Sequence, residues 1–294
     1  MNTKILRRTL GVAAVLGLLL VGTQRDGKTD EPSGRPDLEH PSTAEQIKDA
    51  ALRGAPIAVW ETLEHAERVE CLDCLSYVEP LLFDRDARVR EIAAWWIRRR
   101  PFGYAEIAIR VRDTLATDSD PVRRAAAANA LGEFLDGGAT PLLVKAIGDS
   151  SADVRVAVLG ALQRLNDPAG VTAIQTALGD GDPRVRKTAI EAGLHTAGFS
   201  DAARVATLLS DPDAVIRAKA ADALGAFKAK GSVAALAALT RTDSDEETRI
   251  AAVNALGELG DAAGRSAVEA ANNDASSRVR DAAHVAGLKL AGSI

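Results

Sequence analysis

An aspartate followed six positions later by an arginine recurs along this chain of 294 residues. Successive arginines of the motif are separated by 34, 31, 31, 31, 32 and 31 residues. The pairs are Asp84/Arg90, Asp118/Arg124, Asp149/Arg155, Asp180/Arg186, Asp211/Arg217, Asp243/Arg249 and Asp274/Arg280. A near-constant period of this size indicates a solenoid, in which each repeat buries its apolar surface against its neighbours.

Each repeat reads as two helices joined by the turn that carries the aspartate. In the fifth repeat Asp213 is expected to cap a helix at its N-terminus. Ile216, Ala220 and Leu224 then recur at helical spacing. A second apolar stretch, from Ala202 to Leu209, lies before the turn. No segment alternates apolar and polar residues as a half-buried strand does, so the sequence predicts an all-α solenoid.

The pattern resembles HEAT repeats, in particular the short HEAT-like repeats of bilin lyase subunits. Besides the aspartate and arginine, the resemblance rests on Ala-Leu-Gly late in the second helix and on an aliphatic residue before the arginine. That residue is Val89, Val154, Val185, Ile216 or Val279, whereas Arg123 and Thr248 depart from the pattern. The resemblance implies a right-handed superhelix of about seven helix pairs over residues 70–294.

The repeated aspartate and arginine are expected to have a structural role and not a catalytic one. A catalytic site is needed once, whereas this pair occurs in every repeat. The resemblance implies that these side chains form hydrogen bonds within and between adjacent repeats, and bonds of this charge-assisted kind are strong. The fold itself says little about chemistry, because function lies in sites grafted onto folds.

The region before the repeats divides into three parts. Residues 1–23 are expected to be a signal peptide or a signal-anchor, since Lys4, Arg7 and Arg8 precede an apolar or small stretch from Thr9 to Val21. That stretch is shorter than the roughly 20 apolar residues that a membrane span needs. Residues 24–42 are polar and proline-containing and read as a flexible linker. Residues 43–69 are predicted to form helices that cap the first repeat.

The charge of the chain argues against a nucleic-acid partner. The formal net charge is −5, and it is −8 without the first 23 residues, whose charged side chains are all basic. A nucleic-acid groove needs a basic stripe that displaces counterions from phosphates. Membrane contact is expected only through an uncleaved N-terminus.

The two cysteines form a Cys-x-x-Cys motif at Cys71 and Cys74. Leu75 follows, so the motif lacks the histidine of a haem attachment site. An exported protein favours a disulfide here, and a redox-active pair, a metal site and free thiols are the alternatives. His65 lies nearby in sequence, but a fourth ligand for zinc is not evident. We therefore predict a disulfide and no bound metal or cofactor.

The aromatic and basic residues near the start of the repeats form the candidate binding site. All three tryptophans, both tyrosines and three consecutive arginines lie between residues 60 and 104. Trp60 and Trp96 are expected to seal the end of an alanine-rich core, whereas the repeat register directs Trp95 toward solvent on the concave side. Because aromatic residues and arginine dominate interface energetics, the candidates for partner contact are Trp95, Arg98, Arg99, Arg100 and Tyr104.

The sequence gives little support for an enzymatic function. HEAT-like hydroxylases bind two iron ions through repeated His-Glu pairs, and none of the four histidines here precedes a glutamate. A bilin-lyase-like activity fits poorly with export. The sequence therefore predicts an exported, bacterial, non-catalytic scaffold for protein partners in the periplasm or cell envelope. The leading alternative is an envelope accessory protein that uses Cys71 and Cys74 for redox chemistry or metal binding.

Overall fold

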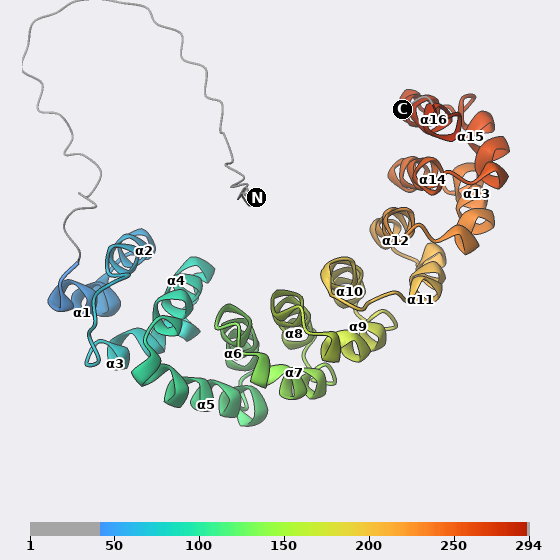
Figure 1. The fold of residues 1–294 in the computed structure, drawn as a ribbon. Helices are drawn as coiled ribbons and strands as arrows, with labels where there is room; N and C mark the ends of the chain where they lie inside the picture. The colour runs from blue at the N-terminus through green and yellow to red at the C-terminus, as the bar shows by residue number, and fades with distance from the viewer. Residues whose placement is uncertain (1–41, 293–294) are drawn as a thin grey trace, which may run out of the picture. The chain divides into compact units, whose positions relative to one another are not determined.

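Pairs of antiparallel α-helices follow one another through residues 42–292, which are the residues that this computed structural model describes (Figure 1). The expected signal segment, residues 1–23, and nearly all of the expected linker, residues 24–42, lie outside them. No strand occurs between residues 42 and 292. Within the same range no helix is both long and apolar enough to span a bilayer. The described part of the chain confirms the all-α solenoid.

Sixteen α-helices lie in the described residues. Their bounds are α1 Ala44–Arg53, α2 Pro56–His65, α3 Leu75–Val78, α4 Ala87–Arg98, α5 Pro101–Thr117, α6 Pro121–Glu133, α7 Thr140–Ala146, α8 Ala152–Leu165, α9 Val171–Ala177, α10 Pro183–His195, α11 Ala202–Thr207, α12 Ala214–Ala226, α13 Val233–Thr242, α14 Glu246–Leu259, α15 Arg265–Ala271 and α16 Ser277–Leu290. Short 3₁₀ turns lengthen several first helices, as in Leu208–Ser210 after α11 and Glu79–Phe83 after α3.

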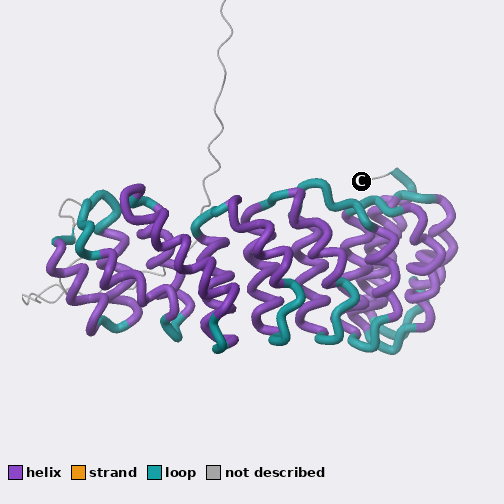
Figure 2. The backbone as a smooth tube through the Cα atoms, turned by 90° about the horizontal axis from the view of Figure 1, so that it is seen from below, coloured by secondary structure: helices purple, strands orange, loops and turns teal. Residues whose placement is uncertain are grey.

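The helices form two layers along the stack. From α4 onward the even-numbered helices lie on the inner side of the arc and the odd-numbered helices on the outer side (Figure 1). Seen from below, the helices lie side by side and the connecting loops gather at the two edges of the stack (Figure 2). The second helix of each repeat, which carries the arginine of the motif, is therefore the inner one.

Local sequence explains where the inner helices begin. The side chain of each motif aspartate accepts a hydrogen bond from the backbone N–H two residues later, as Asp211 does from Asp213 at 2.9 Å. Asp213 in turn caps α12 by accepting from the N–H of Val215 at 2.8 Å, as predicted. Two short polar side chains thus stop the outer helix and start the inner one.

Glycines of the Ala-Leu-Gly signature let inner helices of adjacent repeats touch. A Cβ atom placed on Gly132 would lie 2.8 Å from the Cα of Ala161, and one on Gly257 would lie 2.9 Å from the Cα of Ala286. Such distances are too short for a side chain, so glycine sets the spacing between these helices. Alanines on the facing surface complete a thin, closely packed core.

The residues before the first repeat form two helices, as predicted. Thr43 begins α1 with a capping box in which its hydroxyl accepts from the N–H of Gln46 and the Gln46 side chain accepts from the N–H of Thr43. Val59 and Leu63 of α2 pack into the same core as the inner helices of the first repeats. The end of the stack is thus covered by helices that lack the motif.

Candidate protein-binding surface

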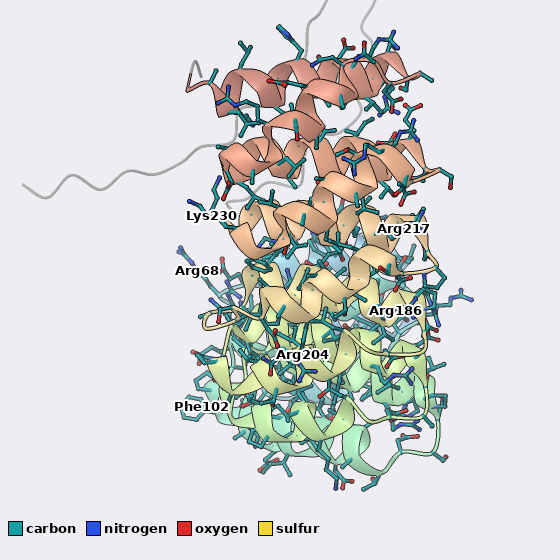
Figure 3. The ribbon with its side chains drawn as sticks, turned by 90° about the vertical axis from the view of Figure 1, so that its right-hand side faces the viewer. Arg68, Phe102, Arg186, Arg204, Arg217 and Lys230 are labelled. Atoms are coloured by element: carbon teal, nitrogen blue, oxygen red, sulfur yellow. A yellow bond between two sulfur atoms is a disulfide. The ribbon has the colours of Figure 1, made fainter. Side chains whose placement is uncertain are left out.

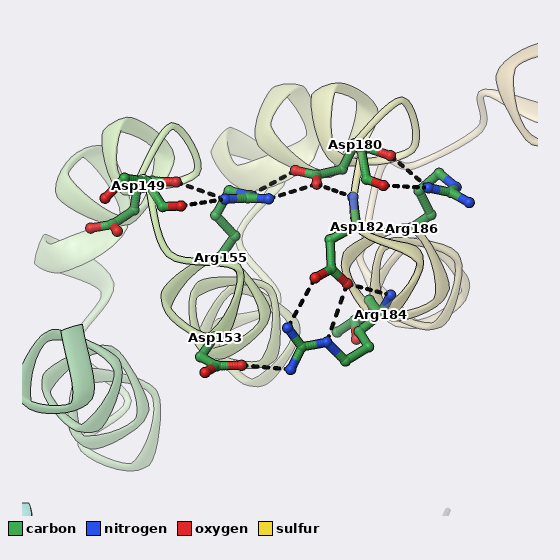
Figure 4. A network of polar contacts seen from close by, with 10 residues as sticks. Asp149, Asp153, Arg155, Asp180, Asp182, Arg184 and Arg186 are labelled. Carbon is green, nitrogen blue, oxygen red and sulfur yellow. Dashed lines mark hydrogen bonds and ion pairs between the residues drawn. The ribbon is translucent and has the colours of Figure 1, made fainter.

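The repeated arginines join neighbouring repeats at one edge of the stack. In five joints the arginine's Nε and Nη2 donate to both carboxylate oxygens of the next repeat's aspartate, at 2.7–2.9 Å and 2.7–3.0 Å. These bridges are Arg124–Asp149, Arg155–Asp180, Arg186–Asp211, Arg217–Asp243 and Arg249–Asp274. Figure 4 shows the Arg155–Asp180 bridge, in which the carboxylate of Asp180 also accepts a hydrogen bond from the N–H of Asp182.

The same arginines also close their own turns. Nη1 of Arg155 donates to the carbonyl oxygen of Asp149 at 2.8 Å, and the other four repeat this bond at 2.8–3.0 Å. The hydrogen bond from Arg124 is the main cause that lowers the pKa of Asp149. In these five joints the side chains are mostly buried and satisfy one another's hydrogen bonds, as structural contacts do.

The first joint lacks this bridge. Nη1 of Arg90 donates to the carbonyl of Asp84 at 2.6 Å, but no carboxylate of the described residues lies within ion-pair distance of its guanidinium. Asp118, the expected partner, is paired instead with Nε of Arg123 at 2.7 Å. The expectation that the pairing continues through every repeat is therefore wrong between repeats one and two, because Arg123 occupies the position of a buried aliphatic residue.

The last arginine of the motif, Arg280, does not bridge two repeats either. Its Nη1 closes its own turn by donating to the carbonyls of Asp274 and Ala275 at 2.7 and 3.0 Å. Its side chain is exposed, and no carboxylate of residues 42–292 lies within ion-pair distance of it. The expectation that Arg280 ties its repeat to a neighbour is therefore wrong. The physical reason is that no further turn with a motif aspartate follows α16 in the described residues.

The three consecutive arginines, Arg98, Arg99 and Arg100, make three different sets of contacts. Arg100 is buried, and its guanidinium donates to the carbonyls of Ala66, Glu67, Val69 and Trp96 at 2.6–3.1 Å. The first two follow the last residue of α2, so the cation satisfies the C-terminal end of that helix. Burial, and secondarily the charge of Arg99, lower the pKa of Arg100 to about 10, so it stays protonated at neutral pH.

The expectation that Arg100 contacts a partner is therefore wrong, because its donors are used inside the protein. Arg98 is half-buried, and its Nη1 donates at 2.8 Å to the carbonyl of Glu133, the last residue of α6. Arg99 is exposed, pairs with Glu67 at 3.1 Å and lies 3.9 Å above the centre of the Trp95 ring. Of the run, Arg99 is the member that faces solvent.

The aromatic candidates are partly used by the core. Trp96 is fully buried and donates from Nε1 to the carbonyl of Ala66 at 3.1 Å, in agreement with a sealing role. Trp95 is half-buried, with Arg99 stacked on one face. Tyr104 packs edge-to-face on Phe134 at 5.3 Å between ring centres, and burial raises its pKa. Trp95 and Arg99 thus form one surface unit, whereas Tyr104 belongs to the packing of α5 against α6.

The two cysteines stand at disulfide distance, with 2.12 Å between the sulfurs and 5.2 Å between the Cα atoms. They lie in the turn that leads into α3. Between residues 42 and 292 no group of three His, Cys, Asp or Glu side chains is placed to hold a metal ion. Arg100 donates a hydrogen bond to the carbonyl of Val69, two residues before Cys71, and so holds the start of this turn in place.

An open pocket lies beside this turn. Its volume is about 320 Å³, and it is lined by Glu70, Cys71, Leu72, Arg99, Arg100, Pro101 and Phe102. Phe102 is 82% exposed and Leu72 is 60% exposed, so two large apolar side chains stand at its rim. Phe102 lies at the opposite edge of the stack from Arg186 and Arg217 (Figure 3). The pocket and the Asp/Arg bridges therefore belong to different edges.

Sequence reasoning missed Leu72 and Phe102. Both are single apolar residues next to turn-forming positions, Asp73 and Pro101, and such residues are common on surfaces. The structure shows that they belong to a cluster: within residues 42–292, seven of the nine exposed large hydrophobic side chains lie from Leu52 to Leu135, and no sequence signal marks them as exposed. The later repeats contribute Val215 and Val285. The exposed apolar surface is thus concentrated in the N-terminal part of the solenoid.

Helix pairs that stack on one another, with a repeated ion pair along one edge of the stack, define a helical-repeat protein. Residues 139–194 and 202–288 match the family model of HEAT repeats, which confirms the resemblance inferred from the motif. These two segments of the chain therefore carry HEAT repeats. A search of curated proteins found no match to this sequence.

Solved structures share the fold. YibA from Escherichia coli is 16% identical with a TM-score of 0.60, over 85% of this chain and 92% of that protein. Kap95p, whose structure concerns its binding to RanGDP, is 14% identical with a TM-score of 0.60, over 84% of this chain and 38% of its own. Kap121p is 13% identical with a TM-score of 0.58, over 84% and 33%. At these identities the likeness establishes the fold alone.

Proposed function

We propose that this protein is an interaction scaffold that binds a protein partner through the N-terminal third of its solenoid. The observation that carries the proposal is the pocket beside the Cys71–Cys74 turn, with Leu72 and Phe102 exposed at its rim. Exposed apolar groups that cluster around a cavity are typical of interaction sites. Arg99, stacked on Trp95, supplies an arginine and an aromatic ring next to it.

The HEAT-repeat fold supports the same proposal from a second direction. Solenoids expose long surfaces that are well suited to protein partners. Kap95p, which shares the fold, binds RanGDP according to the description of its structure. A rigid frame also suits binding, because the buried Arg100 and the core residue Trp96 hold the rim in place before a partner arrives.

We also propose that the protein is exported to the cell envelope. Lys4, Arg7 and Arg8 followed by the apolar stretch Thr9 to Val21 have the composition of an export signal. The disulfide distance between Cys71 and Cys74 suits an oxidising compartment. A chain that lacks residues 1–23 is expected to stay in the cytosol, and unchanged export of that chain would contradict this part of the proposal.

Site-specific photo-crosslinking tests the binding surface. A photoreactive phenylalanine analogue at position 102 is expected to capture a partner in cells, whereas the same analogue at Val215, an exposed apolar position in a later repeat, captures none. In the position-102 protein, Trp95→Ala and Arg99→Glu are each expected to reduce the adduct. Equal adducts from positions 102 and 215, or folded Trp95 and Arg99 variants with undiminished adducts, would place the partner elsewhere, with the inner-helix positions from Asn129 to Asn254 next to be tested.

A further inference from the structure

The open joint between repeats one and two exposes an arginine in the same setting that binds aspartate elsewhere in the chain. In the five later joints the arginine uses Nη1 for its own turn and the remaining fork, Nε and Nη2, for a carboxylate. Arg90 makes the first contact, with Nη1 donating to the carbonyls of Asp84 and Arg85 at 2.6 and 3.1 Å. Its fork has no carboxylate partner among the residues described.

Two arginines, Arg98 and Arg123, lie at this open joint. Arg123 replaces the buried aliphatic residue, pairs with Asp118 and lies 4.3 Å above the centre of the Phe83 ring. Arg98 stands at the position where α6 carries Gly132, which contacts the next inner helix directly. The side chain of Arg98 instead spans to the carbonyl of Glu133. Arg98 is too large for the close approach that Gly132 and Gly257 allow. Gln163 and Leu194 occupy the same position in two joints that keep the bridge, so the pairing of Arg123 with Asp118 is the feature that sets the first joint apart.

Cavities fill the space that results. One of about 380 Å³ is lined by Arg90 together with Phe83, Pro121, Val122, Ala125 and Asn129, among others. A smaller one of about 150 Å³ lies between α4 and α6 and also reaches Arg90. Val122 at the rim of the first is 71% exposed. Arg90 therefore lines a groove that has an apolar wall and room for a peptide side chain.

The acidic groups around Arg90 are mostly engaged by other partners. Asp84 accepts from the N–H of Asp86 at 2.7 Å, and Asp153 is paired with Arg184 at 2.7 Å. Glu133, at the smaller cavity, is paired with Arg164 at 2.7 Å. Glu91 lines the same cavity and is exposed, beyond ion-pair distance of Arg90. An added carboxylate would thus meet a cation whose charge no neighbour in the groove neutralises through a direct bond.

We propose that the fork of Arg90 binds a carboxylate from an extended acidic segment of a partner protein, and that an aliphatic side chain next to that carboxylate rests on Val122. The proposal rests on the proposed scaffold function and names a second contact for it. The proposed contact has the same form as one that the chain makes itself. In five other joints the Nε and Nη2 atoms of the equivalent arginine bind an aspartate. Bidentate arginine–carboxylate pairs add geometric specificity to the charge attraction.

Titration with a small peptide tests this site directly. The probe is acetyl-Leu-Asp-Leu-amide, its control is the same peptide with asparagine, and the readout is the NMR signal of Arg90 Nε–H. The aspartate peptide is expected to shift that signal while Arg155, whose fork is filled, stays unchanged. Arg90→Gln is expected to weaken binding about tenfold or more. Equal shifts with the asparagine peptide would overturn the proposal.

Arg280 provides an internal control for charge attraction alone. It closes its own turn as Arg90 does, but its side chain is exposed on the last inner helix, whereas Arg90 is half-buried between two repeats. The aspartate peptide is therefore expected to shift the Arg90 signal at concentrations that leave the Arg280 signal unchanged. Equal responses from the two arginines would show that the groove adds nothing, and would overturn the proposal.

Two further variants separate the site from general destabilisation. Arg123→Val restores the aliphatic residue and frees Asp118 to fill the fork of Arg90, so binding should fall about tenfold. Asp118→Asn in the same protein empties the fork again and should restore binding. If Arg123→Val binds as the parent does, the fork is not the site.

Other ligands of Arg90 would give different results in the NMR experiment. An Arg90 signal that moves when residues 1–41 are removed, or that depends on protein concentration without peptide, would identify the chain's own segment or a second copy, and either result overturns the proposal. The crosslinking experiment at position 102 probes the opposite edge. Its failure would remove the scaffold surface proposed there without changing the peptide titration, so the two proposals fail separately.

Discussion

The joint between repeats one and two and the five joints that follow use the same motif with opposite outcomes. In the later joints an arginine bridges to the next aspartate, and small residues such as Gly132 and Gly257 let inner helices meet. In the first joint Arg123 takes the position of a mostly aliphatic residue and pairs with Asp118, Arg98 takes the position of Gly132, and a groove lies beside Arg90. The difference teaches that the motif alone does not close a joint, because a neighbouring arginine can take the aspartate that would otherwise form the bridge.

At the N-terminal end, buried contacts of another kind join the capping helices to the first repeat. Arg100 binds four carbonyls and stacks on Trp96 at 3.6 Å, so it ties α2, the cysteine turn and α4 together. In the later repeats, small buried side chains and an ion pair at one edge of the stack hold adjacent repeats together. Stability in the first region therefore depends on one buried cation, whereas in the second it is distributed over equivalent joints.

Arg100→Ala is expected to have the largest effect. It leaves buried carbonyls such as that of Trp96 without their donor, at about 1–3 kcal/mol for each unsatisfied group, and it removes the stack on Trp96. We expect a loss of about 3 kcal/mol in the free energy of unfolding, measured by urea denaturation. Arg68→Ala, at an exposed position of the same region, is the control and should change little. A parent-like midpoint for Arg100→Ala would show that the cation is dispensable.

Arg186→Ala and Arg90→Ala compare a closed joint with the open one. Loss of Arg186 removes a bidentate bridge and leaves Asp211 buried, so a cost of about 2–3 kcal/mol is expected. Loss of Arg90 removes turn hydrogen bonds only, so about 1 kcal/mol or less is expected. The measurement is the urea midpoint of both variants in the same buffer. Equal costs would mean that the first joint is closed in solution.

Acid should reduce the difference in stability cost between Arg186→Ala and Arg90→Ala. The pKa of Asp211 is lowered: burial opposes the shift, but hydrogen bonds from Arg186 and from the N–H of Asp213 outweigh it. A lowered pKa in the folded protein means that the bridge contributes its full stability above the ordinary aspartate pKa of about 4 and loses it as the pH falls further. The cost of Arg186→Ala should therefore shrink below about pH 4, whereas that of Arg90→Ala should stay constant.

Unfolding curves of the parent and both variants between about pH 7 and about pH 3 provide the measurement. Arg90 serves as the matched control, because its bonds go to carbonyl oxygens that do not titrate in this range. A cost of Arg186→Ala that is independent of pH would contradict the assignment of its stability to the Asp211 carboxylate.

The sequence by itself determined the solenoid, the turn chemistry and the approximate bounds of the helices. Local spacing is enough for these, since Asp213 caps its own helix and the period of 31 residues places equivalent residues in equivalent positions. It also placed Cys71 and Cys74 within reach of each other, because a separation of three residues limits their distance whether the backbone is helical or in a turn.

Only the tertiary structure decided which partners the long side chains reach. Arg98, Arg99 and Arg100 are adjacent and alike in sequence, yet one reaches the end of α6, one stacks on Trp95 and one is buried at the end of α2. The physical reason is that an arginine's partner is set by which helix ends converge around it, and those ends come from residues more than 30 positions away. The same reason explains why Arg90, which makes the same contact with its own turn as its equivalents do, has its fork open to a groove.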